Sequence, residues 1–246
     1  MVDFGQMFNY VLLNYALIFV IFISLLIALL MNLIYKWMTD QNLMKSLKDE
    51  MKKYQQDMKK ESKDPKKVME IQKKSMEVNM KYMSSSLKPS FITLIPALLI
   101  FAWLGSVLSY DPITPGQTFT TTVVFENGIS GNMAIVVPPE INVLENSTKE
   151  IKDGKVVWKL IGKEGEYLIE YKYNEKSYKK EALITAKQEF KMPLQKIGDK
   201  TVKTISIDNN PKKIMNLFGW KLGWIGTYII FSFIFSISLR SLMKIY

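Results

Sequence analysis

The chain has no cysteine and no histidine, and it has a single arginine among its 246 residues. It therefore cannot form disulfides, cannot use Cys or His as a nucleophile or general base, and lacks the usual zinc and haem ligands. An enzyme of this composition would need a pair of carboxylates near its apolar segments, and Asp111 stands alone at the edge of one. We expect no catalytic residue, no metal site and no cofactor.

Charge is absent from three long stretches, and each predicts a membrane-spanning helix. Residues 4–35 carry no charged side chain. Their apolar run, residues 11–34, would form a helix of about 36 Å, longer than a hydrocarbon core of roughly 30 Å. Asp3 precedes this run without any Lys or Arg, so the basic region of a signal peptide is missing. We expect residues 1–35 to be a retained first span.

The second and third uncharged stretches are shorter. Residues 89–110 contain Pro96, which a membrane helix tolerates but which is expected to kink it. Residues 222–239 are closed by Arg240 and Lys244. We expect a second span in 89–110, and a third span with a short tail in 222–246.

Residues 36–88 are too polar to cross a bilayer, with fourteen Lys against eight Asp and Glu, a local charge of 14 − 8 = +6. Apolar residues recur there at heptad-like spacings, which predicts two amphipathic helices paired as an antiparallel coiled-coil hairpin. Asp64 and Pro65 suit the start of the second helix. The expected seam comprises Leu47, Met51, Tyr54 and Met58 in the first arm, and Met69, Met76, Met80, Met83 and Leu87 in the second.

The two junctions of the hairpin with the spans are expected to differ. No helix breaker occurs before Ser62, so the first span should continue into the first arm as one long helix. The serines at 84–86 and Pro89 mark the junction between the second arm and the second span.

Eight methionines lie between Met38 and Met83. Two interpretations stay open: they form the hairpin core, or some remain exposed as an adaptable surface for varied apolar segments. The candidates for either role are Met51, Met58, Met76, Met80 and Met83.

Residues 111–210 change character, because β-branched and aromatic residues alternate with polar ones. Turn signals at Asn127-Gly128, Asp153-Gly154 and Glu164-Gly165 separate short runs. About six to eight strands in roughly a hundred residues predict an all-β, sandwich-like domain. The clearest runs are 118–125, 133–137, 155–161, 166–173, 178–186 and 201–207.

Two further features flank this domain. Asn146 begins an Asn-Ser-Thr sequon and is a glycosylation candidate. Residues 211–221 mix apolar and aromatic side chains with Lys, which predicts a short helix lying on the membrane interface, with Trp224 as a second anchor.

The basic residues set the expected orientation. If the hairpin is cytoplasmic, Arg240 and Lys244 fall on the same side after three crossings, while Asp3 and residues 111–221 fall outside. The expected fold is therefore an α-helical membrane protein with three transmembrane helices, a cytoplasmic coiled-coil hairpin, and an extracytoplasmic β-domain between helices 2 and 3. Its N-terminus would be outside and its C-terminus cytoplasmic.

A span, a basic cytoplasmic hairpin and two further spans resemble the archaeal YidC-like branch of the Oxa/YidC/Alb insertase superfamily, over residues 8–110 and 211–246. The resemblance implies a three-helix groove that passes hydrophobic segments from the ribosome into the bilayer, without nucleotide or metal. It also implies nascent membrane proteins as partners, with ribosome, translocon, lipid and a small membrane protein as further candidates. Two departures stand out: the first span lacks the groove arginine of bacterial members, and the β-domain interrupts the second-to-third span connection.

A groove needs polar groups at membrane depth. Asn14 and Asn32 are eighteen residues apart, five helical turns, and would share one face of a continuous helix, with Ser24 about 80° away. Such residues either line a groove or bond across helices and to their own i−4 carbonyls as packing contacts. The groove candidates are Asn14, Ser24, Asn32, Thr93, Thr227, Ser232 and Ser236.

Other classes of function stay open. A receptor-like or structural protein would bind a ligand through the outer β-domain and use the coiled coil to signal or oligomerise. A channel subunit is disfavoured, because no charged residue lies inside a predicted span. The hairpin lysines could bind ribosomal RNA or anionic lipid, but a solvated face is the default for most of them, and we expect no DNA partner.

Overall fold

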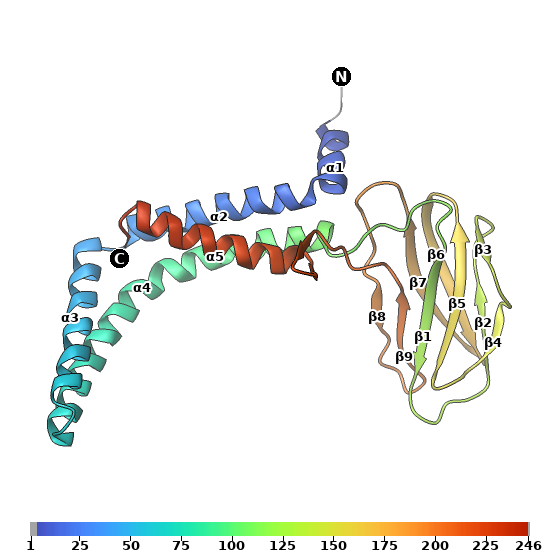
Figure 1. The fold of residues 1–246 in the computed structure, drawn as a ribbon. Coiled ribbons are helices and arrows are strands. Elements are labelled where there is room, and N and C mark those ends of the chain that lie inside the picture. The colour runs from blue at the N-terminus through green and yellow to red at the C-terminus, as the bar shows by residue number, and fades with distance from the viewer. Residues whose placement is uncertain (1–3, 246) are drawn as a thin grey trace. The chain divides into compact units, whose positions relative to one another are not determined.

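The computed structural model describes residues 4–245, which form five helices and eleven strands (Figure 1). The chain divides into two compact units. One unit contains the chain up to Ala16 together with Leu104–Trp224, and the other contains Leu17–Trp103 together with the chain from Ile225 onward. The first unit holds the β-structure, and the second holds most of the long helices.

Within the described residues, three helices are long and apolar enough to cross a membrane. They are α2 (Ala16–Met38), α4 (Pro65–Leu108) and α5 (Trp224–Leu242), and each contains one of the predicted spans. The chain is therefore built as a multi-pass membrane protein.

The first uncharged stretch is not one helix, which corrects the prediction for residues 1–35. Helix α1 (Phe4–Asn14) ends before Tyr15, and α2 begins at Ala16. The Nδ2 atom of Asn14 donates to the carbonyl of Tyr10 at 2.9 Å, so the side chain occupies an acceptor of the helix backbone. Asparagine competes with the backbone in this way and favours helix ends.

The two hairpin junctions are the reverse of those expected. Helix α3 (Gln41–Lys60) is separate from α2, because the Asp40 carboxylate caps it by accepting from the amides of Asn42 and Leu43 at 2.9 and 3.1 Å. Helix α4 instead runs unbroken from Pro65 through Pro89 and Pro96. The second arm and the second span are therefore a single helix of 44 residues.

The β-domain consists of two antiparallel sheets that enclose one core (Figure 1). All six predicted runs are strands. The domain contains nine strands within residues 111–210, three of them only three residues long and edge-forming. In spatial order, the larger sheet is β3 (Ile141–Val143), β5 (Lys155–Gly162), β1 (Phe119–Phe125), β9 (Val202–Ile207) and β8 (Leu194–Lys196), and the smaller is β4 (Thr148–Glu150), β2 (Asn132–Val136), β6 (Gly165–Tyr173) and β7 (Lys176–Ile184).

Aromatic side chains from both sheets fill this core. Trp158 of β5 and Tyr171 of β6 are fully buried, with ring centroids 6.0 Å apart. Their polar atoms are satisfied: the Trp158 Nε1 atom donates to the carbonyl of Ser147 at 3.2 Å, and the Tyr171 hydroxyl hydrogen-bonds to Thr121. Buried aromatics with satisfied polar ends fix one packing arrangement, so the two sheets are held face to face without disulfides.

The loop before β9 is fixed by a carboxylate. Asp199 accepts hydrogen bonds from the Tyr178 hydroxyl at 2.7 Å and from the amides of Thr201 and Val202 at 2.8 and 2.5 Å. Burial by itself would raise the pKa of Asp199, but these hydrogen bonds outweigh it and hold that pKa well below its usual range. Burial and the same contact raise the pKa of Tyr178 to about 12. Asp199 therefore stabilises the domain at neutral pH, and this contribution is lost progressively as the pH falls from the carboxyl's ordinary pKa to its lowered pKa in the folded protein.

Residues 211–221 form a β-hairpin and not the predicted interfacial helix. Strand β10 (Met215–Leu217) pairs with β11 (Trp220–Leu222) around a two-residue turn, Phe218-Gly219, in which both residues have positive φ, 49° and 93°. The Oδ1 atom of Asn216 accepts from the Gly219 amide at 3.0 Å and supports the turn. Glycine at the second turn position favours a tight hairpin over a helix.

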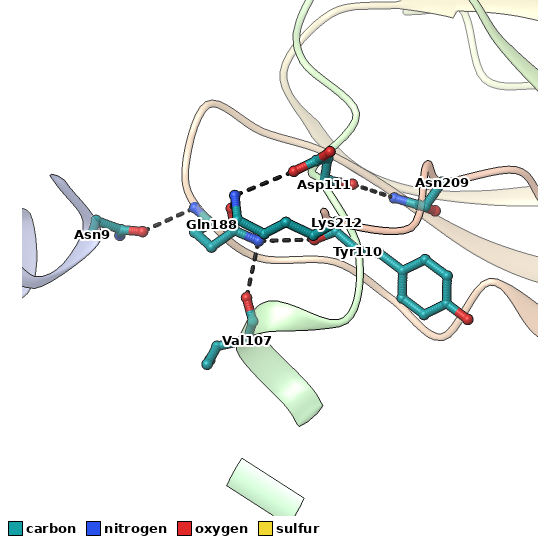
Figure 2. Close-up of polar contacts among 7 residues, drawn as sticks. All are labelled: Asn9, Val107, Tyr110, Asp111, Gln188, Asn209 and Lys212. Atoms are coloured by element: carbon teal, nitrogen blue, oxygen red, sulfur yellow. Dashed lines mark hydrogen bonds and ion pairs between the residues drawn. The ribbon is translucent and has the colours of Figure 1, made fainter. Parts of the chain in front are cut away.

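A buried polar cluster fastens the β-domain to α1 and to the end of α4, all within the first unit (Figure 2). Gln188, 1% exposed, donates through its Nε2 atom to the carbonyls of Val107 and Tyr110 at 2.9 and 2.8 Å. The Oε1 atom of Gln188 accepts from the buried Lys212 ammonium at 2.8 Å, and its backbone amide donates to the Oδ1 atom of Asn9 at 2.9 Å.

The cluster also pairs its one buried charge. The Lys212 ammonium lies 3.2 Å from the Asp111 carboxylate, and the Asp111 carbonyl accepts from Asn209 at 3.2 Å (Figure 2). One amide side chain, Gln188, thereby binds one carbonyl in the last turn of α4 and one just beyond its end, and helps to satisfy a lysine. The β-domain is attached to the helix ends by more than chain connectivity.

Replacing Gln188 with Ala should lower the free energy of unfolding of the β-domain by about 1–3 kcal/mol, because two carbonyls and a buried ammonium each lose a partner. Tryptophan fluorescence during urea unfolding of the purified protein in detergent would measure this. The exposed Asn142 provides the control, since Asn142→Ala should change the same free energy by less than about 0.5 kcal/mol. Equal stabilities of the two variants would contradict the role of Gln188.

Candidate functional site

The three spans of the second unit contact one another at the end away from α3, and α2 also contacts the end of α5 near α3. At the end near α3, the Arg240 Nε atom donates to the Oδ1 atom of Asn32 at 3.3 Å, and the Lys36 ammonium donates to the carbonyl of Met243 at 3.0 Å. The partners in these two contacts are 208 and 207 residues apart, so residue numbers increase in the same direction along α2 and along the end of α5.

At the opposite end, aromatic side chains bring α4 against both other spans. The rings of Phe19 and Trp103 lie 6.1 Å apart, and those of Phe101 and Tyr228 lie 4.7 Å apart, edge to face. These contacts join the first turns of α2 and α5 to the last turns of α4, so α4 is antiparallel to both.

These contacts align the three helices, so side chains at the same height along the bundle can be matched by counting residues; we call each such height a level. Counting along each helix from the aromatic end places Ser24 of α2, Ala97 of α4 and Ser232 of α5 at one level. One turn further, Ala28, Thr93 and Ser236 share the next level. A further turn reaches Asn32 of α2 and Arg240 of α5, which are hydrogen-bonded, and by the same count Pro89 of α4. Five of the seven predicted groove residues thus lie in the half of the spans nearer the hairpin, while aromatic contacts join the spans in the other half.

The side chains at these levels face inward. Ser24 is 0% exposed and Asn32 is 2% exposed, while Thr93, Ser232 and Ser236 are half-buried. On α5 the lipid-accessible face is apolar, with Ile225, Ile229, Phe233 and Ile237 all exposed. The polar groups therefore face protein, as their cost in lipid requires. Thr227, also fully buried, lies apart from them at the aromatic end.

The hydroxyl groups are mostly satisfied within their own helices. Ser24 donates to the carbonyl of Val20 at 2.7 Å, Thr93 to that of Pro89 at 3.1 Å, and Ser232 to that of Ile229 at 3.1 Å. Such bonds reduce the cost of a hydroxyl in the membrane and leave its lone pairs available. They are compatible with packing contacts and with a polar groove lining.

Asn32 differs from the hydroxyls. Its Oδ1 atom accepts from Arg240, but its buried Nδ2 atom donates to no acceptor among the described residues. A buried amide donor without a partner costs about 1–3 kcal/mol. The Arg240 guanidinium also lies over the Tyr35 ring, 5.0 Å from its centroid. The end of the spans near the hairpin thus holds a cation and an amide with spare hydrogen-bonding capacity.

Sequence reasoning used Arg240 for orientation alone and missed its place beside Asn32. The signal was present: Arg240 is the only arginine in the chain, and it follows Ser232 and Ser236 at steps of four.

Asn14 does not belong to this cluster. It lies in α1 and in the other unit, on the far side of the helix break at Tyr15, and its side chain is exposed. The five-turn phase that placed it on one face with Asn32 required an uninterrupted helix, so that prediction is wrong.

The hairpin pairs α3 with the first part of α4, and its seam is only partly the predicted one. In α3, Leu47 is buried and Met51, Tyr54 and Met58 are half-buried, as expected, and Met44 joins them. In α4 the inward residues are not the methionines. They are Val68, Ile71, Ser75, Val78 and Tyr82, which repeat at steps of three and four. Whether the two helices supercoil stays a prediction.

The methionines of the second arm form an exposed stripe. Met69, Met76, Met80 and Met83 are 67%, 57%, 65% and 49% exposed. The prediction of the second-arm seam was wrong. Two series of residues on α4 recur with the same helical spacing, and the series that contains Val and Ile, not the methionine series, faces α3. The methionines of the second arm are therefore available to other molecules, and an adaptable surface for apolar segments stays a prediction.

Because α4 is continuous, this stripe runs on into the span. Leu87, Phe91, Leu94 and Leu98 follow at steps of four, four, three and four, and are 46%, 65%, 49% and 56% exposed. We call Met69, Met76, Met80, Met83, Leu87, Phe91, Leu94 and Leu98 the α4 stripe.

A groove of about 380 Å³ opens between the arms near the spans. It is lined by Leu43 and Leu47 of α3 and by Met80, Lys81, Ser84 and Ser85 of α4. Ser85 lies one helical turn before Pro89, which shares a level with Asn32 and Arg240. The groove therefore includes Met80 of the α4 stripe and lies in the part of the hairpin next to the second span.

Two other candidate sites can be placed. Asn146 is exposed in the loop between β3 and β4, so the sequon is accessible, and its glycosylation stays a prediction. Within residues 4–245, no three acidic side chains gather closely enough to hold a metal ion.

The seam and the stripe can be separated by mutation. Ile71→Asp with Val78→Asp should open the hairpin, since burying each such side chain contributes about 1.5–3 kcal/mol. Met69→Ser, Met76→Ser and Met83→Ser together should leave it closed, because these side chains are exposed. Pulsed electron spin resonance between labels at Gln56 and Lys73 would measure the separation of the arms. A widened distance in the methionine variant would show that these residues form the seam after all.

The comparisons with known proteins identify the family. The model of the integral membrane protein EMC3/TMCO1-like family matches residues 5–138, more than half of the chain. The matched region contains α1 to α4 and the first two strands, and leaves out α5. The comparisons with curated proteins and with solved structures found no match. The chain belongs to the EMC3/TMCO1-like family of integral membrane proteins, within the Oxa1/YidC/Alb3 superfamily.

Proposed function

We propose that this protein inserts other membrane proteins, by binding their apolar segments on the hairpin and passing them to lipid beside the spans. The observation that carries the proposal is the Asn32–Arg240 pair at the hairpin end of a bundle whose polarity falls toward the other end. Polar side chains at membrane depth mark pathways for polar groups, because burial there is otherwise too costly. The insertase-related superfamily supports the same function.

The α4 stripe is the proposed receiving surface. Flexible methionine side chains suit apolar segments of varied shape. Since α4 is one helix, a segment bound at Met76 can move toward Leu87 and Phe91 without leaving the same face. The exposed Phe91 and Leu94 then border lipid.

The polar levels are the proposed path for the client's hydrophilic flank. The unpartnered Nδ2 atom of Asn32 can donate to a client carbonyl or carboxylate, and Arg240 supplies the positive charge. Bacterial members use an arginine of the first span, whereas here the charge would come from the third span. No covalent step is required, so we propose that the protein is not an enzyme.

We propose that the hairpin is cytoplasmic and the β-domain extracytoplasmic. The hairpin's net charge of +6 and the basic residues after α5 support this orientation. A cytoplasmic hairpin could meet nascent chains at the ribosome or translocon, and a small membrane protein could cover part of the exposed spans. Each of these partners is a proposal.

The groove is tested by comparing two asparagines. Asn32→Leu should slow insertion of clients with short charged flanks by about tenfold, equivalent to ~1.4 kcal/mol, because the flank loses a hydrogen-bonding group at depth. Purely apolar clients should insert at an unchanged rate. Insertion into liposomes containing the purified protein, scored by protease protection, measures both.

Asn14→Leu is the matched control, since Asn14 is exposed, belongs to the other unit and bonds only to its own helix. It should leave both client types unaffected. If Asn32→Leu behaved like Asn14→Leu, the polar path would be wrong and the receptor-like alternative would gain.

The orientation is tested by labelling, which the absence of native cysteine makes simple. Ser62→Cys and Ser241→Cys should react with an impermeant maleimide only after the cells are opened, and Thr148→Cys should react in intact cells. All three side chains are exposed in the structure. Labelling of Ser62→Cys in intact cells would invert the proposed orientation.

A further inference from the structure

The β10–β11 hairpin exposes large apolar side chains that no other part of residues 4–245 covers. Phe218 at its tip is 99% exposed, Trp220 is 73% exposed and Leu217 is 38% exposed. Two short paired strands do not make a stable unit in water. This hairpin therefore requires a partner surface.

The strand register makes the hairpin amphipathic. Met215 pairs with Leu222, and Leu217 pairs with Trp220, while Asn216 pairs with Lys221 between them. Since side chains alternate between faces along a strand, the two apolar pairs share one face and the polar pair occupies the other. The hairpin thus has one apolar face, one polar face and an aromatic tip.

The turn of the β10–β11 hairpin places Phe218 in a backbone conformation that glycine or asparagine would adopt with less strain. Phe218 has φ 49°, in the left-handed region that favours glycine or asparagine. The β6–β7 hairpin of the same chain has a similar two-residue turn, and there Asn174 takes the left-handed position, with φ 51°. A bulky aromatic in this conformation indicates that its side chain is needed at the tip.

The base of the hairpin is fixed where two spans end. The Lys212 amide donates to the carbonyl of Ser109, immediately after α4, at 3.0 Å. The Trp224 Nε1 atom donates to the Ser109 hydroxyl at 3.3 Å, and Trp224 begins α5. The hairpin therefore starts at the boundary where α4 leaves the membrane and α5 begins.

We infer that the β10–β11 hairpin is a membrane wedge that inserts Leu217, Phe218 and Trp220 into the lipid interface beside the point where these spans emerge. Aromatic side chains favour that depth, and the exposed Lys213 and Lys221 can reach lipid phosphates. The apolar face contacts the same bilayer that the protein spans. Only one residue, Gly223, separates β11 from the span α5, so the hairpin lies next to that membrane.

The test uses the full chain in liposomes, with the single-cysteine variant Phe218→Cys carrying an environment-sensitive nitrobenzoxadiazole label. Lipids bearing a nitroxide near the headgroup should quench the label, its emission should shift to the blue, and aqueous iodide should quench it weakly. Glu175→Cys, in the matched polar turn of β6–β7, should show none of these changes. Asn216→Cys, on the polar face, should be quenched less by lipid than Phe218→Cys.

Trp220→Cys repeats the measurement on the strand if the tip variant does not fold. Free access of iodide at both Phe218→Cys and Trp220→Cys would overturn the wedge. Shielding from iodide without quenching by nitroxide lipid would also overturn it, because a protein partner or a second copy would then cover the face.

Discussion

The fixed period of one unbroken helix governs much of the second unit. Over its 44 residues, α4 keeps side chains at steps of three and four on the same face, so whatever faces inward in the hairpin also faces inward in the span. Its inner face runs from Val68 and Val78 to Pro89 and Ala97. Its outer face is the α4 stripe. Had the helix broken at Pro89, the receiving surface and the span would be independent.

Polar groups along the spans follow a second constraint, the cost of an unpaired polar group in lipid. Serine and threonine meet it by bonding to their own helix, as Ser24 does with Val20. Asn32 does not meet it fully, because its amide donor bonds neither to its own helix nor to another acceptor among the described residues. The Arg240 guanidinium donates to its oxygen, and its Nδ2 atom has no acceptor among the described residues. This unpartnered donor is the reason why the proposed path of the client's hydrophilic flank includes Asn32.

The first unit follows a different principle, in which polar contacts tie together parts that are distant in sequence. Gln188 joins the β-domain to α1 and α4, and Lys212 joins the same cluster to the base of the β10–β11 hairpin (Figure 2). Both side chains are buried, so their hydrogen bonds are protected from competition with water. The β10–β11 hairpin consequently projects from a fixed base.

Hydrophobic periodicity and turn chemistry in the sequence determined the three spans, the helical hairpin and its turn, and the strands of the β-domain. These features depend on neighbours along the chain, as with the Asp153-Gly154 turn, whose residues have φ of 53° and 68°.

The local patterns failed where two sets of residues recurred with the same helical spacing. The methionine and the valine–isoleucine series of α4 both fit a seam, and only packing against α3 decided between them. The break at Tyr15, the cap at Asp40 and the turn at Phe218-Gly219 were likewise missed, because an uninterrupted apolar or basic pattern does not show where a side chain competes with the backbone. The pairing of Asn32 with Arg240 joins residues 208 apart, and the contact of Gln188 with Asn9 joins residues 179 apart. No local pattern encodes such contacts, because they arise only when the folded helices and sheets bring those side chains together.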